Sequence, residues 1–127
     1  MAEVQKIAVV DVQKVVDKSA QVQALKKEQE LKQQEMAKFI KQCGEEIQKQ
    51  TDNAKKKALS EKYGKELKTK QEANAKAYKA KLESIDKSIN NAIVQQAKAL
   101  GYDVILVKGV VLYGGDDITE SILKVVK

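Results

Sequence analysis

One stretch of the sequence decides the fold, and it reads Met36-Ala-Lys-Phe-Ile-Lys-Gln-Cys-Gly-Glu-Glu-Ile-Gln-Lys-Gln-Thr-Asp-Asn53. Its apolar residues are separated by four, three and four positions: Met36, Ile40, Cys43 and Ile47. This is the heptad spacing of a coiled-coil seam, so we predict a helix whose apolar stripe packs on another helix. On that stripe, Cys43 is expected to act as a small buried hydrophobic residue.

The same stretch ends in residues 51–53, Thr-Asp-Asn, which are poor helix formers and suit a helix cap. Beyond them, a second set of apolar residues repeats the spacing: Tyr78, Leu82, Ile85 and Ile89. Residues 21–100 contain no proline and consist mainly of strong helix formers. We therefore predict an antiparallel coiled-coil hairpin over residues 21–100, with its tip near residues 51–58 and Gly64 as an alternative hinge.

Polar residues interrupt the predicted seam halfway along both helices. They occupy positions where apolar side chains are expected: Gln29, Lys32, Gln71 and Asn74. Polar side chains give a coiled coil less apolar contact than leucine or isoleucine does. We predict that the two helices are held loosely at this level.

The N-terminal end has a different composition. Residues 6–10 are rich in β-branched residues and predict a buried strand that ends at Asp11. Asp11 would cap a short helix that carries Val12, Val15 and Val16.

The C-terminal end is also rich in β-branched residues. Gly101 suits the end of the long helix. Residues 104–107 and 110–113 predict two strands joined by a two-residue loop at 108–109, and Gly114-Gly115 predicts the next turn.

A short C-terminal helix is predicted after this turn. Asp117 followed by Glu120 has the spacing of a capping box, which explains the acidic pair Asp116-Asp117 better than a metal site does. The apolar residues of this helix share one face: Ile118, Ile122, Leu123 and Val126.

The β-branched segments of the two chain ends, residues 6–16 and 101–127, together contain fewer than the ~40 residues that an unaided core usually needs. We therefore predict an α+β fold in which residues 1–20 and 101–127 of several copies form a small, oligomeric β-rich body, and residues 21–100 form the helical-hairpin arm. The residues expected to hold the copies together are Ile7, Val9, Val104, Leu106, Val107, Val111, Tyr113, Ile118 and Ile122.

Composition argues against most kinds of catalysis. The 127 residues include no histidine, no arginine and a single cysteine. Histidine-assisted nucleophiles, imidazole zinc sites and internal disulfides therefore cannot form. We expect no enzyme activity, no cofactor and no metal.

The net charge of +6 is concentrated near the predicted hairpin tip. Residues 49–81 contain eleven lysines and four carboxylates. Any single lysine is explained by solubility, but the whole cluster favours attraction of acidic partners. The candidate partner-binding residues of the arm, which include apolar ones expected to be accessible, are Lys49, Lys55, Lys56, Lys57, Lys62, Lys65, Lys68, Leu31, Phe39, Leu59 and Tyr63.

Four short motifs at the chain ends resemble those of the Skp/OmpH-like periplasmic chaperones. They are Lys6-Ile-Ala-Val-Val-Asp11, Gly101-Tyr-Asp-Val-Ile-Leu106, Val111-Leu-Tyr113 and Asp117-Ile-Thr119. The resemblance implies a jellyfish-like trimer that holds unfolded outer-membrane proteins between its arms without ATP. It also implies a periplasmic location and a signal peptide that has been removed.

Some members of this family also bind lipopolysaccharide through a basic patch that contains arginine. This chain has no arginine, so we assign no residue to such a site, although anionic lipid and lipopolysaccharide stay candidate partners. Other functions are open at this point: a prefoldin-like cytosolic chaperone, a coiled-coil scaffold without clients, or a nonspecific nucleic-acid binder. Aromatics make up 4% of the chain, too few for base stacking, which argues against nucleic acid.

Overall fold

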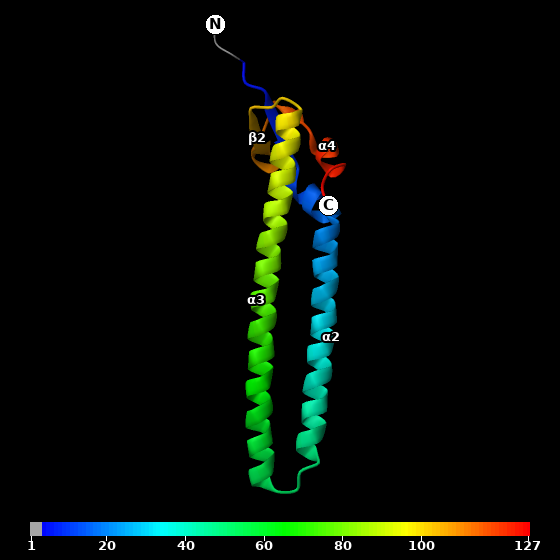
Figure 1. The fold of residues 1–127 in the computed structure, drawn as a ribbon, viewed down its shortest axis with the longest axis vertical. Coiled ribbons are helices and arrows are strands. Elements are labelled where there is room, and N and C mark those ends of the chain that lie inside the picture. The colour runs from blue at the N-terminus through cyan, green and yellow to red at the C-terminus, as the bar shows by residue number, and fades with distance from the viewer. Residues whose placement is uncertain (1–3) are drawn as a thin grey trace. The chain divides into compact units, whose positions relative to one another are not determined.

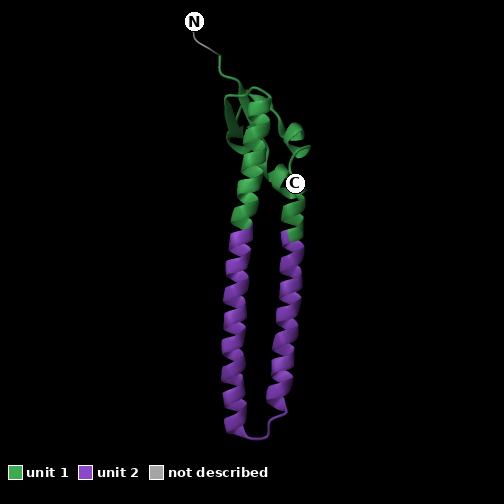
Figure 2. Ribbon diagram, in the orientation of Figure 1, with its two compact units in different colours: residues 1–24, 82–127 green, residues 25–81 purple. Residues whose placement is uncertain are grey.

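A computed structural model describes residues 4–127, and Figure 1 shows its helices and its small sheet. The chain divides into two compact units, which Figure 2 distinguishes by colour. The sheet unit consists of residues 1–24 and 82–127, and the hairpin unit consists of residues 25–81. Helices α2 (Ala20–Gln48) and α3 (Asn53–Ala99) each contribute residues to both units.

The sheet has three parallel strands in the order β2-β1-β3. The central strand β1 (Ile7–Val10) pairs with β2 (Val104–Val107) on one side and with β3 (Asp116–Asp117) on the other. Two parallel strands cannot be joined by a tight turn. The long helices therefore serve as the crossover between β1 and β2.

The prediction of a strand at residues 110–113 is wrong. The chain leaves β2 through a short 3₁₀ helix, η1 (Lys108–Val110), and the third strand forms later, at Asp116–Asp117. A hairpin at residues 108–109 would have placed an antiparallel strand next to β2, whereas the chain crosses to the free edge of β1. β-branched residues favour a strand only where they pair with a neighbouring strand, and residues 110–113 pair with no strand among residues 4–127 although one edge of β2 is open.

The core of the sheet unit combines both chain ends with the last turns of α3. Its buried residues are Ala8, Val10, Val15, Ile89, Ile93, Ala97, Ile118 and Ile122. Ile89, Ile93 and Ala97 lie in the range 21–100 that we expected to form the arm. By recruiting α3, the two ends gain a core that they could not build alone.

Two predicted helix ends are confirmed. Helix α1 (Val12–Lys18) begins after Asp11, whose carboxylate accepts a hydrogen bond from the backbone N–H of Lys14 at 3.1 Å. Gly101 follows α3 with a φ of +84°, a conformation that glycine adopts without steric cost.

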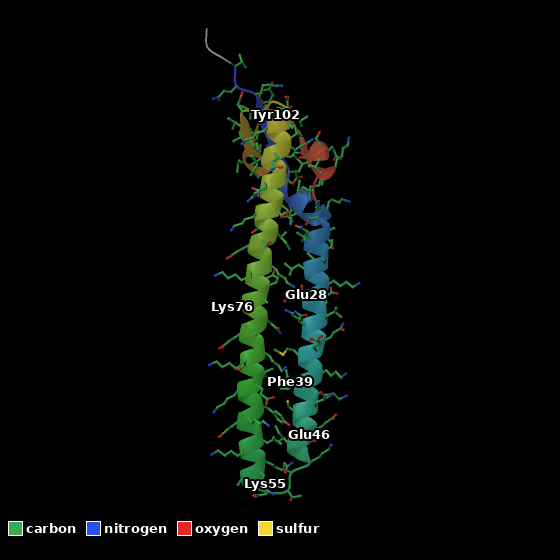
Figure 3. The ribbon with its side chains drawn as sticks, viewed as in Figure 1. Glu28, Phe39, Glu46, Lys55, Lys76 and Tyr102 are labelled. Atoms are coloured by element: carbon green, nitrogen blue, oxygen red, sulfur yellow. The ribbon has the colours of Figure 1, made fainter. Side chains whose placement is uncertain are left out.

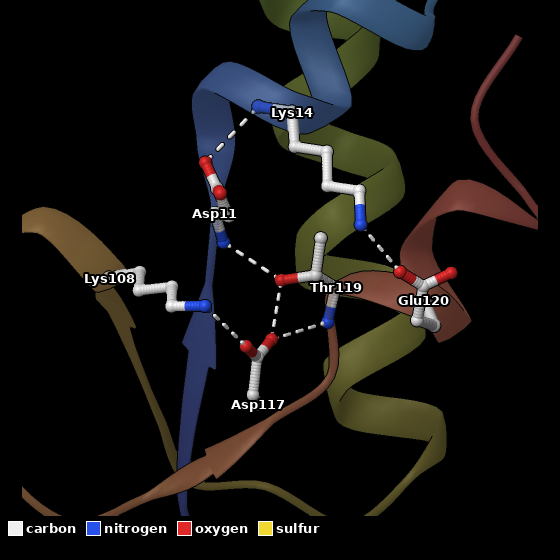
Figure 4. A network of polar contacts seen from close by, with 6 residues as sticks. All are labelled: Asp11, Lys14, Lys108, Asp117, Thr119 and Glu120. Atoms are coloured by element: carbon white, nitrogen blue, oxygen red, sulfur yellow. Dashed lines mark hydrogen bonds and ion pairs between the residues drawn. The ribbon is translucent and has the colours of Figure 1, made fainter.

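The predicted capping box at the C-terminal helix does not form. Helix α4 (Thr119–Leu123) has Ile118 at its N-cap, without a side-chain hydrogen bond. Asp117 instead belongs to β3, and its carboxylate accepts hydrogen bonds from the backbone N–H and the hydroxyl of Thr119 (Figure 4). Because the helix begins at Thr119, Glu120 is its second residue and not the third, as a capping box requires, and it pairs with Lys14 at 2.8 Å.

This polar network joins the chain ends within the sheet unit (Figure 4). The Thr119 hydroxyl accepts a hydrogen bond from the Asp11 backbone N–H at 2.9 Å, and the Lys108 ammonium lies 3.2 Å from the Asp117 carboxylate. The hydrogen bonds from Thr119, followed by that from Lys108, lower the pKa of Asp117 to about 2. The carboxylate is therefore ionised in all but strongly acidic solution.

The hairpin unit consists of two antiparallel helical arms. The first arm is the part of α2 from residue 25 onward, the second is the part of α3 up to residue 81, and residues 49–52 join them. Asp52 begins the second arm: its carboxylate accepts a hydrogen bond from the Ala54 backbone N–H at 3.0 Å. Gly64, the alternative hinge, lies inside α3.

Candidate functional site

The two units differ sharply in charge. The hairpin unit has sixteen lysines and nine carboxylates, a net charge of +7, whereas the sheet unit has eight lysines and nine carboxylates. Within the hairpin unit the first arm, residues 25–48, is balanced at five of each sign. The second arm, residues 53–81, has ten lysines and three carboxylates, so it carries the whole excess of positive charge.

Most lysines of the second arm are exposed and unpaired. Lys76, for example, points away from α2, and Lys55 lies at the end of the hairpin (Figure 3). The exposed lysines of this arm that form neither an ion pair nor a cation–π contact with any residue from 4 to 127 are Lys55, Lys57, Lys62, Lys65, Lys68, Lys76 and Lys79. We call these seven residues the lysine face. Fixed unpaired charges of one sign attract oppositely charged chains and speed their encounter.

Five of the seven predicted arm lysines belong to the lysine face. Lys56 is half-buried, and Lys49 is paired with Glu46 at 3.3 Å. Lys76 and Lys79 were not among the predicted residues, although both are exposed. Their helical spacing from Lys62 and Lys65 is the sequence feature that could have identified them.

The predicted apolar partner-binding residues fall into two groups. Leu31 is 51% exposed and available for contact. Phe39 and Tyr63 are half-buried, because their rings pack edge to face with centroids 6.2 Å apart, and Leu59 is also half-buried. The Lys70 ammonium lies 5.0 Å from the centroid of the Phe39 ring, within cation–π range. Phe39 and Tyr63 therefore help to join the arms, and both are only partly accessible to a partner.

The seam itself is buried at few positions. Cys43 is buried as predicted, and this burial raises the pKa of its thiol. Ile40, one heptad position earlier, is 52% exposed, and Tyr78 is 39% exposed. The hairpin unit thus presents apolar side chains beside its lysines, a mixture suited to contact with unfolded polypeptide.

The sheet unit has an exposed apolar surface of its own. β2 lies at an edge of the sheet, and Leu106 and Val107 on it are 39% and 49% exposed. Val110, Leu112 and Tyr113 in the following segment are 80–102% exposed. Large exposed apolar side chains beside an open strand edge mark an interaction surface.

The predicted contact residues between copies occupy three environments. Leu106, Val107 and Tyr113 are exposed, Ile7 is 36% exposed, and Val104 and Val111 are half-buried. Val9, Ile118 and Ile122 are buried within their own chain. The sequence could not separate these groups. In such short segments, an apolar residue that faces the core of its own chain has no pattern that distinguishes it from one that faces solvent.

Two further features are absent from residues 4–127. In this part of the chain no three histidine, cysteine or acidic residues gather in a way that could hold a metal ion. None of its helices is both long enough and apolar enough to cross a membrane.

A family model described as outer membrane protein (OmpH-like) matches residues 6–126. The chain belongs to the OmpH-like family. Members of this family are periplasmic chaperones of outer-membrane proteins, and the resemblance seen in the end motifs is confirmed. The small parallel sheet and the long helices fit the family's α+β fold. A comparison with curated proteins finds no match.

Proposed function

We propose that this OmpH-like protein is an ATP-independent holdase for unfolded outer-membrane proteins in the periplasm. The observation that carries the proposal is the lysine face, which lies in the same hairpin unit as exposed Leu31 and Ile40. The lysines would attract an unfolded acidic chain from a distance, and the apolar side chains would retain it on contact.

Release without an energy source requires weak individual contacts. A lysine that is exposed on a helix contributes little to affinity in any one ion pair, and it exchanges partners readily. A client held by many such contacts is protected from aggregation and can still leave when a tighter partner takes it up. The same charges make anionic lipid surfaces a second candidate partner.

We further propose that the protein works as a homotrimer. The body would be built around residues 1–20 and 101–127, and residues 21–100 would supply an arm whose last turns complete the core of the body. Support comes from the open edge of β2 and the adjacent exposed residues Val110, Leu112 and Tyr113. Three copies that share these surfaces would cover them, and their arms would enclose a cavity for the client.

The test compares two triple variants that remove the same charge. The first, Lys55→Gln, Lys62→Gln and Lys76→Gln, neutralises part of the lysine face. The control, Lys87→Gln, Lys98→Gln and Lys124→Gln, changes three exposed lysines of the sheet unit that form no ion pair with a residue from 4 to 127. The readout is aggregation of a urea-diluted acidic membrane barrel without nucleotide, followed by light scattering.

We expect the first variant to slow capture of the barrel about tenfold at low salt and the control to act like the wild type. The difference should shrink as salt is added, because salt screens exposed charges. Equal loss in both variants would contradict a role for the lysine face. A wild-type protein that does not suppress aggregation at all would favour a scaffold without clients.

A further inference from the structure

A groove of about 380 Å³ lies inside the hairpin unit, at the level where polar residues interrupt the seam. Met36, Ala37 and Ile40 of the first arm form its apolar surface, and the amide side chains of Gln29, Gln71 and Asn74 surround it. Apolar residues at the three amide positions would interlock and fill this space. The groove therefore exists because the sequence places amides where a coiled coil needs apolar side chains.

The packing around the groove is incomplete. The side-chain nitrogen of Gln29 is buried and has no hydrogen-bond partner among residues 4–127. A buried donor without an acceptor is unfavourable and uncommon in folded proteins. The unpaired donor shows that the polar residues at this level do not satisfy one another.

An ion pair, rather than apolar packing, joins the two arms beside the groove. The Lys81 ammonium of the second arm lies 2.5 Å from the Glu28 carboxylate of the first, and Lys32 lies 3.6 Å from the same carboxylate. Glu28 is labelled in Figure 3. The side chains of Glu28 and Lys32 are 32% and 25% exposed, so solvent reaches both, and a guest carboxylate can take up Lys32 while Glu28 stays paired with Lys81.

We propose that this groove binds an apolar side chain of an unfolded polypeptide, at a position where the neighbouring residue of that polypeptide is acidic. The apolar side chain would lie on Met36, Ala37 and Ile40, and the amides would donate hydrogen bonds to the guest backbone carbonyls. The guest carboxylate would pair with Lys32, in keeping with the net charge of +7 on this unit. The inference rests on the proposed holdase function and specifies which client sequence the hairpin holds best.

The size of the groove suits one side chain rather than a folded partner. Small-ligand sites are typically about 300–1,000 Å³, and this groove is near the lower limit. An extended chain places successive side chains on opposite sides. One apolar side chain can therefore enter the groove while its acidic neighbour lies toward solvent, within reach of the long Lys32 side chain at the rim.

The test uses the absence of tryptophan from this protein. The probe is a ten-residue peptide with one tryptophan between aspartates. Its tryptophan fluorescence changes on binding, and the signal comes from the peptide alone. Ala37→Leu fills the groove with a larger apolar side chain and removes no polar group. Leucine is also a good helix former, so the helix should be kept. Ala75→Leu is the matched control, because Ala75 is also an exposed alanine of the hairpin unit but does not line the groove.

We expect the peptide to bind the full-length wild type and Ala75→Leu equally, and to bind Ala37→Leu about tenfold more weakly. A second peptide with lysines in place of the aspartates should bind poorly to all three proteins. Circular dichroism checks that each variant is folded. A photoreactive tryptophan analogue in the peptide should crosslink to residues 29–40 or 71–74.

Several results would overturn the inference. One is equal binding to wild type and Ala37→Leu, and another is crosslinking confined to other residues. Failure of the wild type to bind the peptide would also overturn it. A fourth result would overturn it as well: Ala37→Leu loses binding of a pyrene-labelled fatty acid but keeps binding of the peptide. The groove would then be a site for an acyl chain. The proposed holdase function survives all of these results if the wild type still suppresses barrel aggregation.

Discussion

The sheet unit and the hairpin unit of this OmpH-like protein are built by different interactions. The sheet unit is close to neutral and buries a cluster of aliphatic residues from both chain ends and from α3. The hairpin unit carries a charge of +7, and Leu25 and Cys43 are its buried hydrophobic residues. Burial of apolar area is the main source of stability. The comparison indicates that the sheet unit is the main source of stability, and it supports our proposal that the hairpin unit presents the client-binding surface.

The largest predicted effect concerns assembly through the sheet unit. Val107→Asp places a charge on the open edge strand β2, at a residue that is 49% exposed. Burying that charge between copies would be costly, so we expect the proposed trimer to dissociate to monomers. Size exclusion with light scattering measures the mass. Val107→Thr keeps the shape without a charge and should stay trimeric, whereas an intact trimer with Val107→Asp would refute an interface at this strand.

The next prediction compares the units directly by truncating one isoleucine in each. Ile122 is fully buried in the sheet unit, so Ile122→Ala should lower the free energy of unfolding by about 2–5 kcal/mol. Ile40 in the hairpin unit is 52% exposed, so Ile40→Ala should cost less than about 1 kcal/mol. Urea unfolding followed by circular dichroism measures both. Equal losses would remove the distinction between a stabilising unit and a working unit.

The smallest prediction concerns the pH dependence of the sheet unit. The pKa of Asp117 is lowered from 3.8 to about 2 in the folded chain, so its ionised form stabilises the fold above about pH 4. This contribution is lost as the pH falls from about 4 to about 2. The Asp117 side chain is 45% exposed, so solvent screening limits the effect to below about 1 kcal/mol.

Asp117→Asn removes this titration and should flatten the pH dependence of unfolding between pH 2 and pH 4. Asp86→Asn changes an exposed carboxylate of the same unit and serves as the control. If the two variants showed the same pH dependence, the network around Thr119 would contribute nothing measurable.

Features that depend on neighbouring residues could be predicted from the sequence. The Asp11 cap and the glycine end of α3 need only a few adjacent residues, and both are confirmed. The heptad spacing identified two long helices, and the amides in the seam indicated the level at which the groove lies. The lysine face follows from helical spacing, although Lys76 and Lys79 were overlooked.

Features that depend on distant residues could not be predicted. The strand expected at residues 110–113 failed because a strand needs a partner, and β1 pairs with residues 116–117 instead. Ile118 and Ile122 were assigned to contacts between copies, whereas they meet the last turns of α3 inside one chain. Phe39 was expected to be free, but Tyr63 lies against it.

The sequence by itself determined the long helices, the helix ends at Asp11 and Gly101, the position of the charge and the family, because each is encoded in local spacing or composition. Only the tertiary structure decided which apolar residues form the core, which edge of the sheet stays open and where the seam leaves a groove. These depend on which residues, remote in the chain, come together. Residue spacing specifies the face on which a side chain lies, but it does not specify what that face meets.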